Sequence, residues 1–262
     1  MNYIDFLETI SQRAGKIILA NFSLGMKKEY KEDFSPVTKT DTEVNKIVIE
    51  EVHKYFPTHD IKGEEESDMT NKSEYVWVCD PVDGTIPFSA GLQISTFSLA
   101  LTYKGEPIAG VIFEPFSDRM ILAEKGKGAF LNGEKIKVNE KSTIDETFIF
   151  ALENYRNSKY NLAKFDQKMT EEMNAKIFRF CSILFAGMMV ALGEFDAVVF
   201  PGKTPHDGAA LKIIVEEAGG KMTDIHGNEQ RYDGEIQGYI ASNGKLQNDL
   251  VKIVSENIIE RY

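Results

Sequence analysis

The residues best suited to chemistry lie in one stretch, EYVWVCDPVDGTIPFSAG, from Glu74 to Gly91. Its apolar run from Tyr75 to Cys79 predicts a buried strand that ends at Asp80. Asp83 follows three residues later, and two carboxylates at the end of a buried strand are unfavourable unless they are paired or bind a cation. Because carboxylate oxygens are ligands for hard cations, the pair indicates a Mg²⁺ site.

A glycine turn and an expected helix start follow the two aspartates. Gly84 would let the backbone approach a ligand closely, Thr85 is expected to cap the helix, and Pro87 suits its first turn. Backbone N–H groups at a helix start favour a bound anion. We therefore predict a site for a phosphate monoester and a metal ion, although Asp, Pro and Gly also dominate ordinary turns.

Other acidic residues could complete this site, namely Asp41, Glu64, Glu65 and Asp207. Each has an ordinary alternative. Asp41 and Asp207 precede expected helices, where Asp is a favoured N-cap. The glutamates stand in a run of three, which is typical of a solvent-exposed loop.

The composition limits the kind of partner. The chain has 262 residues, and its 30 basic and 41 acidic side chains give a net charge of −11, which argues against a nucleic-acid or membrane-surface partner. Cys79 and Cys181 both have apolar neighbours and suggest no disulfide framework. Without a signal-peptide pattern or a membrane-spanning run, the chain is expected to be cytoplasmic.

The hydrophobic pattern changes along the chain. It predicts an antiparallel sheet in an N-terminal half (1–145) and alternating helices and strands in a C-terminal half (146–262), an α+β layer joined to an α/β layer in one compact unit. Thr40 and Glu43 fit a capping box for the second helix. The expected helices span about 2–24, 40–56, 159–174, 183–193, 208–219 and 245–259. The expected strands span 59–63, 75–79, 94–103, 107–114, 120–124, 128–131, 148–152, 176–181, 195–200, 221–224 and 238–242.

The aspartate pair does not fit other phosphate-binding or metal-binding motifs. The P-loop and EF-hand templates are not matched. Phosphatases of the haloacid dehalogenase type place a second aspartate two residues after a nucleophilic one, at the first strand. Asp80 and Asp83 are three residues apart and lie a third of the way along the chain, so a covalent phosphoenzyme is not expected.

The combination of motifs resembles the inositol monophosphatase family, the Mg²⁺-dependent, lithium-sensitive phosphatases. The likeness spans about residues 35–243 and rests on TKTD (38–41), GEE (63–65), WVCDPVDGT (77–85), GVIFEP (110–115), EKGKGAFLNGEKIKV (124–138), DGAA (207–210) and EAGG (217–220). It implies the layered αβαβα sandwich of the sugar phosphatases, with a mixed second sheet. It also implies a homodimer that hydrolyses a small phosphorylated metabolite, nominally inositol 1-phosphate.

Carried over position by position, the resemblance implies two or three Mg²⁺ ions. The expected metal ligands are Glu64, Asp80, the Val82 carbonyl, Asp83 and Asp207. The residues expected to activate the attacking water are Asp41, Glu64 and Thr85. The backbone of Gly84 and Thr85 would receive the phosphate oxygens, and Glu65 would support the metal ligands from behind.

The chain departs from the family where the substrate would bind. Many members have a run of small residues where this chain has Cys181, Ser182, Ile183 and Leu184. Phe200 takes the place of an acidic residue that contacts an inositol hydroxyl in animal members, and His206 replaces a tryptophan. The six positions are the expected substrate-recognition residues.

Phenylalanine at position 200 cannot accept a hydrogen bond from a substrate hydroxyl, and the loss of such an acceptor relaxes discrimination between substrates. Histidinol phosphate, 3′-phosphoadenosine 5′-phosphate and fructose 1,6-bisphosphate therefore stay open as alternative substrates. A second alternative is a non-catalytic regulator that binds a metal or a phosphorylated metabolite. The pair Asp41 and Thr85 speaks against it, because a binding protein has no need to activate water.

Overall fold

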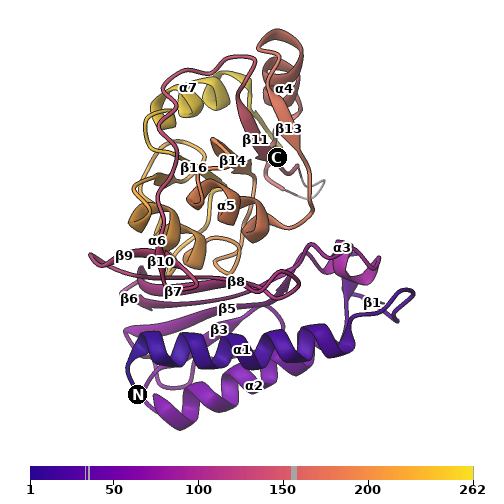
Figure 1. The fold of residues 1–262 in the computed structure, drawn as a ribbon, viewed down its shortest axis with the longest axis vertical. Coiled ribbons are helices and arrows are strands. Elements are labelled where there is room, and N and C mark those ends of the chain that lie inside the picture. Colours follow the sequence, from indigo (N-terminus) through magenta and orange to yellow (C-terminus); the bar gives the residue numbers. More distant parts are fainter. Residues whose placement is uncertain (33, 35, 155–157, 262) are drawn as a thin grey trace.

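Helices and sheets alternate in five layers. The computed structural model describes residues 1–32, 34, 36–154 and 158–261. Its helices are α1 (Tyr3–Asn21), α2 (Lys39–Tyr55), α3 (Thr85–Ser89), α4 (Ala163–Gln167), α5 (Ile183–Ala191), α6 (Ala209–Glu217) and α7 (Gln247–Asn257), with one π-helical turn, η1 (Lys168–Glu172). Helices α1 and α2 form one outer layer, α5 and α6 lie between two sheets, and α4 and α7 form the other outer layer (Figure 1). This is the αβαβα sandwich expected from the resemblance.

The first sheet has eight strands among the described residues and is largely antiparallel. In sheet order the strands are β10 (Glu134–Lys135), β9 (Gly128–Leu131), β8 (Arg119–Glu124), β7 (Glu106–Glu114), β6 (Thr96–Tyr103), β5 (Tyr75–Asp83), β3 (Asp60–Gly63) and β4 (Ser67–Asp68). The pairing of β3 with β5 is parallel. A short pair, β1 (Glu29–Tyr30) with β2 (Pro36–Val37), precedes α2.

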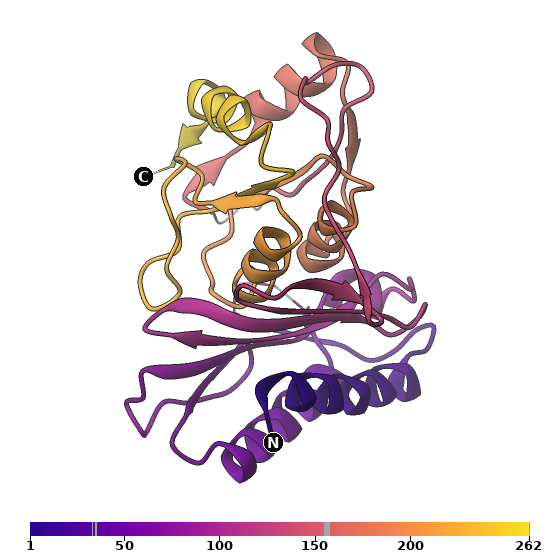
Figure 2. The same ribbon diagram turned by 60° about the vertical axis from the view of Figure 1, so that its left-hand side comes forward.

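The second sheet is mixed, as predicted. Its order is β13 (Lys176–Phe178), β11 (Ile149–Leu152), β14 (Ala197–Phe200), β16 (Tyr239–Ser242) and β15 (Lys221–Thr223). Strand β11 runs parallel to β13 and β14, whereas β16 is antiparallel to its neighbours. Figure 2 shows the two sheets on opposite sides of α5 and α6.

Apolar helix faces fill the space between the layers. In α1 the buried residues Leu7, Ile10, Ala14 and Ile18 recur every three or four positions, so one face packs on the first sheet. Helices α5 and α6 bury almost every residue because each lies between two sheets. None of the described helices combines the length and the apolar composition needed to cross a bilayer.

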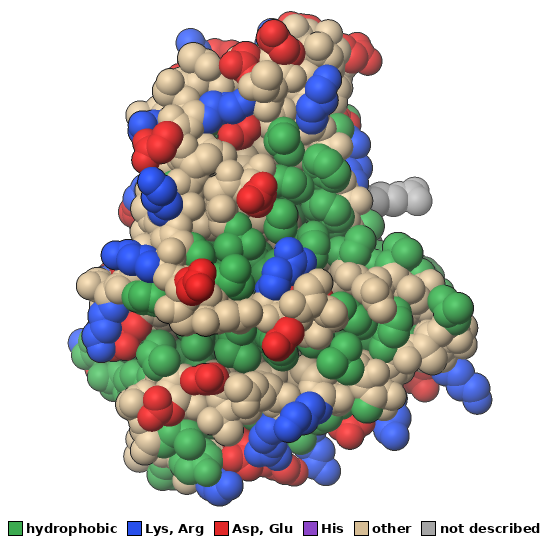
Figure 3. Space-filling view, viewed as in Figure 1, with side chains coloured by type: hydrophobic (Ala, Val, Ile, Leu, Met, Phe, Trp, Pro, Cys, Tyr) green, Lys and Arg blue, Asp and Glu red, His purple; other side chains and the backbone are tan. Residues whose placement is uncertain are grey.

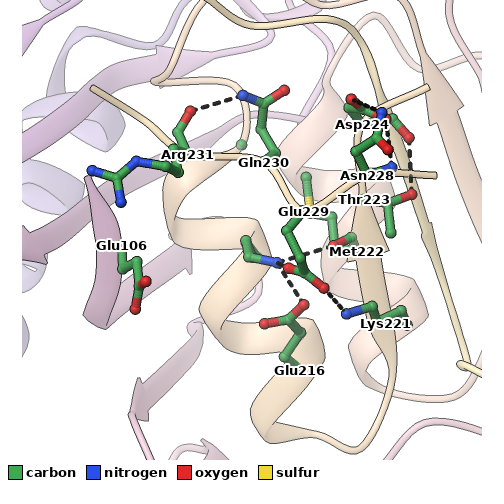
Figure 4. A network of polar contacts seen from close by, with 12 residues as sticks. Glu106, Glu216, Lys221, Met222, Thr223, Asp224, Asn228, Glu229, Gln230 and Arg231 are labelled. Atoms are coloured by element: carbon green, nitrogen blue, oxygen red, sulfur yellow. Dashed lines mark hydrogen bonds and ion pairs between the residues drawn. The ribbon is translucent and has the colours of Figure 1, made fainter. Parts of the chain in front are cut away.

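A buried lysine anchors α6 at the edge of the second sheet. Lys212 donates to Glu216 within the helix at 2.6 Å, to the Met222 carbonyl at 3.0 Å and to Glu229 at 2.9 Å. Glu229 also pairs with Lys221 of β15 (Figure 4). Because a buried ammonium is unfavourable without such partners, this network fixes α6 relative to the sheet.

Strand β5 extends beyond the predicted end. It continues to Asp83 instead of ending at Cys79, with Asp80 opposite Ser98 and Asp83 opposite Thr96 of β6. The register shifts between the two aspartates. Such a bulge accommodates the intervening Pro81, which cannot donate a ladder hydrogen bond.

The capping box of α2 lies two residues before the predicted one. Thr38 is the N-cap, its hydroxyl accepts from the Thr40 N–H, and the Asp41 carboxylate accepts from the Thr38 N–H. The prediction that used Thr40 and Glu43 was therefore wrong. Both sets of residues fit the pattern in sequence, and the actual helix start decides between them.

The predicted helix at 159–174 is only partly helical. Residues Tyr160–Asn161 form β12, which pairs with β17 (Ile259–Glu260), so α7 also ends at Asn257 instead of about 259. The helical part is divided between α4 and η1. Strand β13 ends at Phe178, and Cys181 adopts a left-handed conformation with φ of 52°.

Candidate active site

Gly84 joins β5 to α3 at the point where the two halves touch. It is the N-cap of α3, with φ of 81°, and a Cβ there would lie 2.8 Å from the Ser182 Cβ and 2.9 Å from the Ile94 carbonyl oxygen. Glycine is thus required by a left-handed backbone and by close packing against Ser182. Thr85 is the first helical residue and not the predicted cap.

Thr85 and Asp41 are brought together from distant parts of the chain. The Thr85 Oγ1 lies 3.0 Å from the Asp41 Oδ1 and 3.0 Å from the Val82 carbonyl oxygen. Asp41 is fully buried, and burial raises the pKa of its carboxyl although Thr38 and Thr85 donate to it. The structure therefore places a buried carboxylate directly behind the Thr85 hydroxyl, the arrangement expected from the resemblance.

Asp80 is the centre of the acidic cluster. Its side chain is buried, with its Oδ1 accepting from the Val82 N–H at 3.1 Å. Burial raises the pKa of Asp80 well above its ordinary value, and the nearby carboxylates of Glu64, Asp83, Asp207 and Asp41 raise it further. Several acids from β5, α2 and the loops after β3 and β14 thus repel one another here, and a cation would relieve that repulsion.

Lys31 supplies one positive charge that the sequence did not indicate. Its Nζ lies 2.8 Å from Glu64 Oε1 and 2.6 Å from Glu65 Oε1. Glu64 and Glu65 therefore form ion pairs with Lys31 and are not part of a solvent-exposed acidic loop. The segment around Lys31 reads as a charged connection in the sequence, and no local pattern predicts that it folds back on the residues after β3.

Asp83 links the two halves through α5. Its carboxylate accepts from the Ser182 hydroxyl and from the backbone N–H groups of Ile183 at 3.1 Å and Leu184 at 3.0 Å. Thr96 of β6 donates to it at 3.2 Å. A carboxylate at the first N–H groups of a helix is stabilised by unpaired donors and the helix dipole. Even so, burial raises the pKa of Asp83 to about 7.

Asp207 lies after β14 and before α6. Thr204 donates its hydroxyl to Asp207 Oδ2 at 2.5 Å, and Gly208 occupies the N-cap position of α6, so the N-cap alternative does not describe Asp207. Burial raises the pKa of its carboxyl. The His206 Nε2 lies 3.9 Å from the Asp207 Oδ1, which places the imidazole beside this acid.

The expected substrate-recognition residues differ in exposure. Cys181 is exposed, in contrast to the apolar setting expected for it. Ile183, Leu184 and Phe200 have almost no exposed surface, and Phe200 stacks on Tyr239 with 4.6 Å between ring centroids. Phe200 is therefore part of the core and presents no side-chain surface to a substrate.

The acidic residues fit a hard cation by their chemistry. Carboxylate and carbonyl oxygens are the ligands that Mg²⁺ prefers, and the raised pKa values of Asp80, Asp83 and Asp207 show charge that lacks compensation. Over the described part of the chain, no three His, Cys, Asp or Glu side chains converge as a ready metal centre. Asp83 faces the amides of α5 and Glu64 faces Lys31 instead.

Comparison with known proteins agrees with this fold. A model of the inositol monophosphatase family matches residues 2–258. A Thermotoga maritima protein named fructose-1,6-bisphosphatase/inositol-1-monophosphatase is 32% identical over 264 residues, covering 99% of this chain and 98% of that protein. A histidinol-phosphatase of Chlorobaculum parvum is 29% identical over 254 residues, or 96% of each chain. The solved structure of Thermotoga maritima IMPase superimposes with a TM-score of 0.86 at 32% identity, over 98% of each chain.

The layered fold, the acidic site and these likenesses together define a metal-dependent phosphomonoesterase. The chain belongs to the inositol monophosphatase family.

Proposed function

We propose that the protein hydrolyses a small phosphate monoester, nominally inositol 1-phosphate, with two or three Mg²⁺ ions. The observation that supports this most strongly is the buried cluster around Asp80, where neighbouring carboxylates raise the pKa of an already desolvated acid. Glu64, Asp80, the Val82 carbonyl, Asp83 and Asp207 would hold the ions. Such a cluster is unfavourable for folding unless it serves to bind cations.

The chain's own residues would orient the reactants. When bound, Mg²⁺ supplies positive charge to the phosphoryl oxygens and lowers the pKa of water. The Thr85 hydroxyl donates to Asp41 at 3.0 Å and would accept a hydrogen bond from the attacking water. A proton from the water would then pass to Thr85 Oγ1 as the Thr85 proton passes to the Asp41 carboxylate, with Glu64 assisting. The backbone of Gly84 and Thr85 would receive phosphate oxygens, and Glu65 would keep Glu64 in place through Lys31.

The choice of substrate is narrowed by the side chains at the expected substrate-recognition positions. Phe200 offers no acceptor for a substrate hydroxyl and is buried against Tyr239, so strict selection of inositol phosphate is not expected. Cys181 is exposed beside the Ser182–Leu184 segment, and His206 lies beside Asp207. These two side chains are therefore placed to influence the choice of substrate. Histidinol phosphate, 3′-phosphoadenosine 5′-phosphate and fructose 1,6-bisphosphate are the alternative substrates.

A panel of these four phosphate esters, compared by kcat/KM in Mg²⁺, tests the proposal. We expect turnover of inositol 1-phosphate with modest preference over the others, and suppression by millimolar Li⁺. A preference for one alternative by two orders of magnitude would reassign the substrate. Absence of phosphate release from every ester, with Mg²⁺ still bound in calorimetry, would favour the non-catalytic regulator.

We also propose a homodimer. Apolar side chains gather across the middle of the face seen in Figure 3, where the two halves meet. Phe178, Phe180 and Phe195 stack on one another, yet Phe178 stays 43% exposed, and a second copy would cover such surface. Light scattering after size-exclusion chromatography should give twice the mass of 29.5 kDa, and Phe178→Asp should shift it to the monomer.

A further inference from the structure

Glu153 is a buried acid that the proposed reaction does not use. It follows β11 directly, is 8% exposed, and its Oε1 accepts from the Cys181 N–H at 2.7 Å. The Phe180 N–H also faces this carboxylate. Arg179 lies nearby but is engaged with Asp166. The direct partners of Glu153 are therefore backbone amides of the segment that leads into α5.

The residue that Glu153 holds has an unfavourable backbone conformation. Cys181 has φ of 52°, in the left-handed region that side chains other than glycine seldom adopt. Such a conformation persists only where neighbouring groups enforce it. The hydrogen bond from the Cys181 N–H to Glu153 is an interaction that can do so.

The next residues of the chain hold Asp83. Ser182 donates its hydroxyl to the Asp83 carboxylate, and the N–H groups of Ile183 and Leu184 donate to it at 3.1 and 3.0 Å. The turn at Cys181 sets the direction in which these donors point. A relaxed turn would therefore displace the donors relative to β5.

We propose that Glu153 is a positioning residue that fixes the turn at Cys181 and thereby aims the N-terminus of α5 at Asp83. Glu153 acts through the backbone and touches neither the substrate nor the ions. Its effect on the reaction rests on the proposed function of Asp83 as a metal ligand. Its effect on the turn at Cys181 is independent of that proposed function.

Two substitutions separate the role of the acceptor from that of the charge. Glu153→Ala removes the acceptor, whereas Glu153→Gln retains an oxygen that can accept from the Cys181 N–H. Cys181→Gly adopts the left-handed conformation at no steric cost. Combined with Glu153→Ala, it should restore the turn without restoring the carboxylate.

Asp196 provides a matched control. It is also a buried acid that accepts a backbone N–H, from Ile149 at 2.7 Å. It precedes β14, whereas Glu153 follows β11. Because these neighbouring strands are parallel, the two acids lie at opposite ends of the strands. Asp196→Ala should therefore lower the melting temperature without affecting the turn at Cys181.

The primary measurement is amide hydrogen exchange of residues 182–185, which needs neither metal nor substrate. Glu153→Ala should raise exchange there by about tenfold or more, while Glu153→Gln and the double variant with Cys181→Gly stay near wild type. Mg²⁺ titration calorimetry of the same proteins should show a loss of about tenfold in affinity for Glu153→Ala alone, as for other groups that orient metal ligands.

Unchanged exchange at residues 182–185 in Glu153→Ala, or an equal rise in Asp196→Ala, would overturn the proposal. So would a raised KM with unchanged Mg²⁺ affinity, because Glu153 would then contact the substrate. If Asp83→Asn loses Mg²⁺ affinity but Glu153→Ala does not, the positioning role fails while the proposed function stands. If the wild type binds no Mg²⁺, the proposed function fails, and the exchange data still decide the role of Glu153.

Discussion

We propose that Asp83 serves both folding and chemistry. It was predicted as a metal ligand, and the structure shows its carboxylate accepting from Ser182, Ile183 and Leu184 at the start of α5. One carboxylate offers about four acceptor positions, so these bonds and a metal ion compete for the same oxygens. The raised pKa of Asp83, about 7, shows that the protein donors do not fully compensate its charge.

Replacing Asp83 by Asn should affect both functions. The amide keeps one acceptor oxygen but turns an NH₂ group toward N–H donors and removes the negative charge. We expect turnover to fall by about two orders of magnitude or more, as when a main electrostatic contributor is lost. Steady-state kinetics at saturating Mg²⁺ measures this, with circular dichroism to confirm folding. Turnover close to wild type would exclude Asp83 as a ligand.

At the scale of elements, the segment before α2 brings a cation to the acidic cluster. Lys31 pairs with Glu64 and Glu65. Burial lowers the pKa of the lysine, but the two glutamates outweigh it and raise this pKa above its ordinary value. The ammonium therefore offsets part of the repulsion among the acids when no metal ion is bound. A bound Mg²⁺ would take over that compensation.

Lys31→Met should accordingly lower stability most in the absence of metal. We expect a lower melting temperature in EDTA and a smaller difference from wild type in Mg²⁺, because either cation compensates the glutamates. Differential scanning calorimetry in both buffers measures this. Lys27→Met, at an exposed lysine of the same segment, is the control. Equal destabilisation with and without Mg²⁺ would contradict the account.

Much of the fold and site could be predicted because the informative residues are local in sequence. The strand-and-turn motif from Tyr75 to Thr85 and the alternation of elements after residue 146 identified the layers. Asp80 and Asp83 indicated an acidic site by their spacing, and the family resemblance added the distant Asp207 to it.

Other features depend on contacts that no local pattern reveals. Lys31, which precedes α2, contacts Glu64 in the segment after β3. Glu153, at the end of β11, accepts from the Cys181 N–H. The left-handed Cys181 gives no sequence signal, because cysteine is not a residue expected there. The requirement for Gly84 was predicted, but its cause is packing against Ser182 and not only access for a ligand.

For the whole molecule, the site lies where the end of β5 in the first sheet meets the start of α5. Asp83 and Gly84 come from the first sheet's end, and both contact the start of α5. Asp207 comes from the loop between β14 and α6. Burial of these acids between the halves raises the pKa values of Asp80, Asp83 and Asp207, so folding and protonation are linked.

The linkage predicts an unusual pH dependence for the metal-free protein. A carboxyl whose pKa is raised by folding binds a proton more tightly in the folded state. Stability therefore falls as the pH rises from the pKa of the unfolded state toward the pKa of the folded state. Because the pKa of Asp83 rises from 3.8 to about 7 on folding, the melting temperature in EDTA should fall between about pH 4 and 7. Mg²⁺ should flatten this decline, and Asp83→Asn should reduce it. A melting temperature that rises across this range in EDTA would contradict the account.

We propose that phosphate release depends on cations held by the buried acids. Release of inorganic phosphate from inositol 1-phosphate, measured while Mg²⁺ is titrated into enzyme stripped with EDTA, tests it most directly. We expect no turnover in EDTA, full recovery on adding Mg²⁺, and suppression by millimolar Li⁺. Sustained turnover in excess EDTA would contradict it.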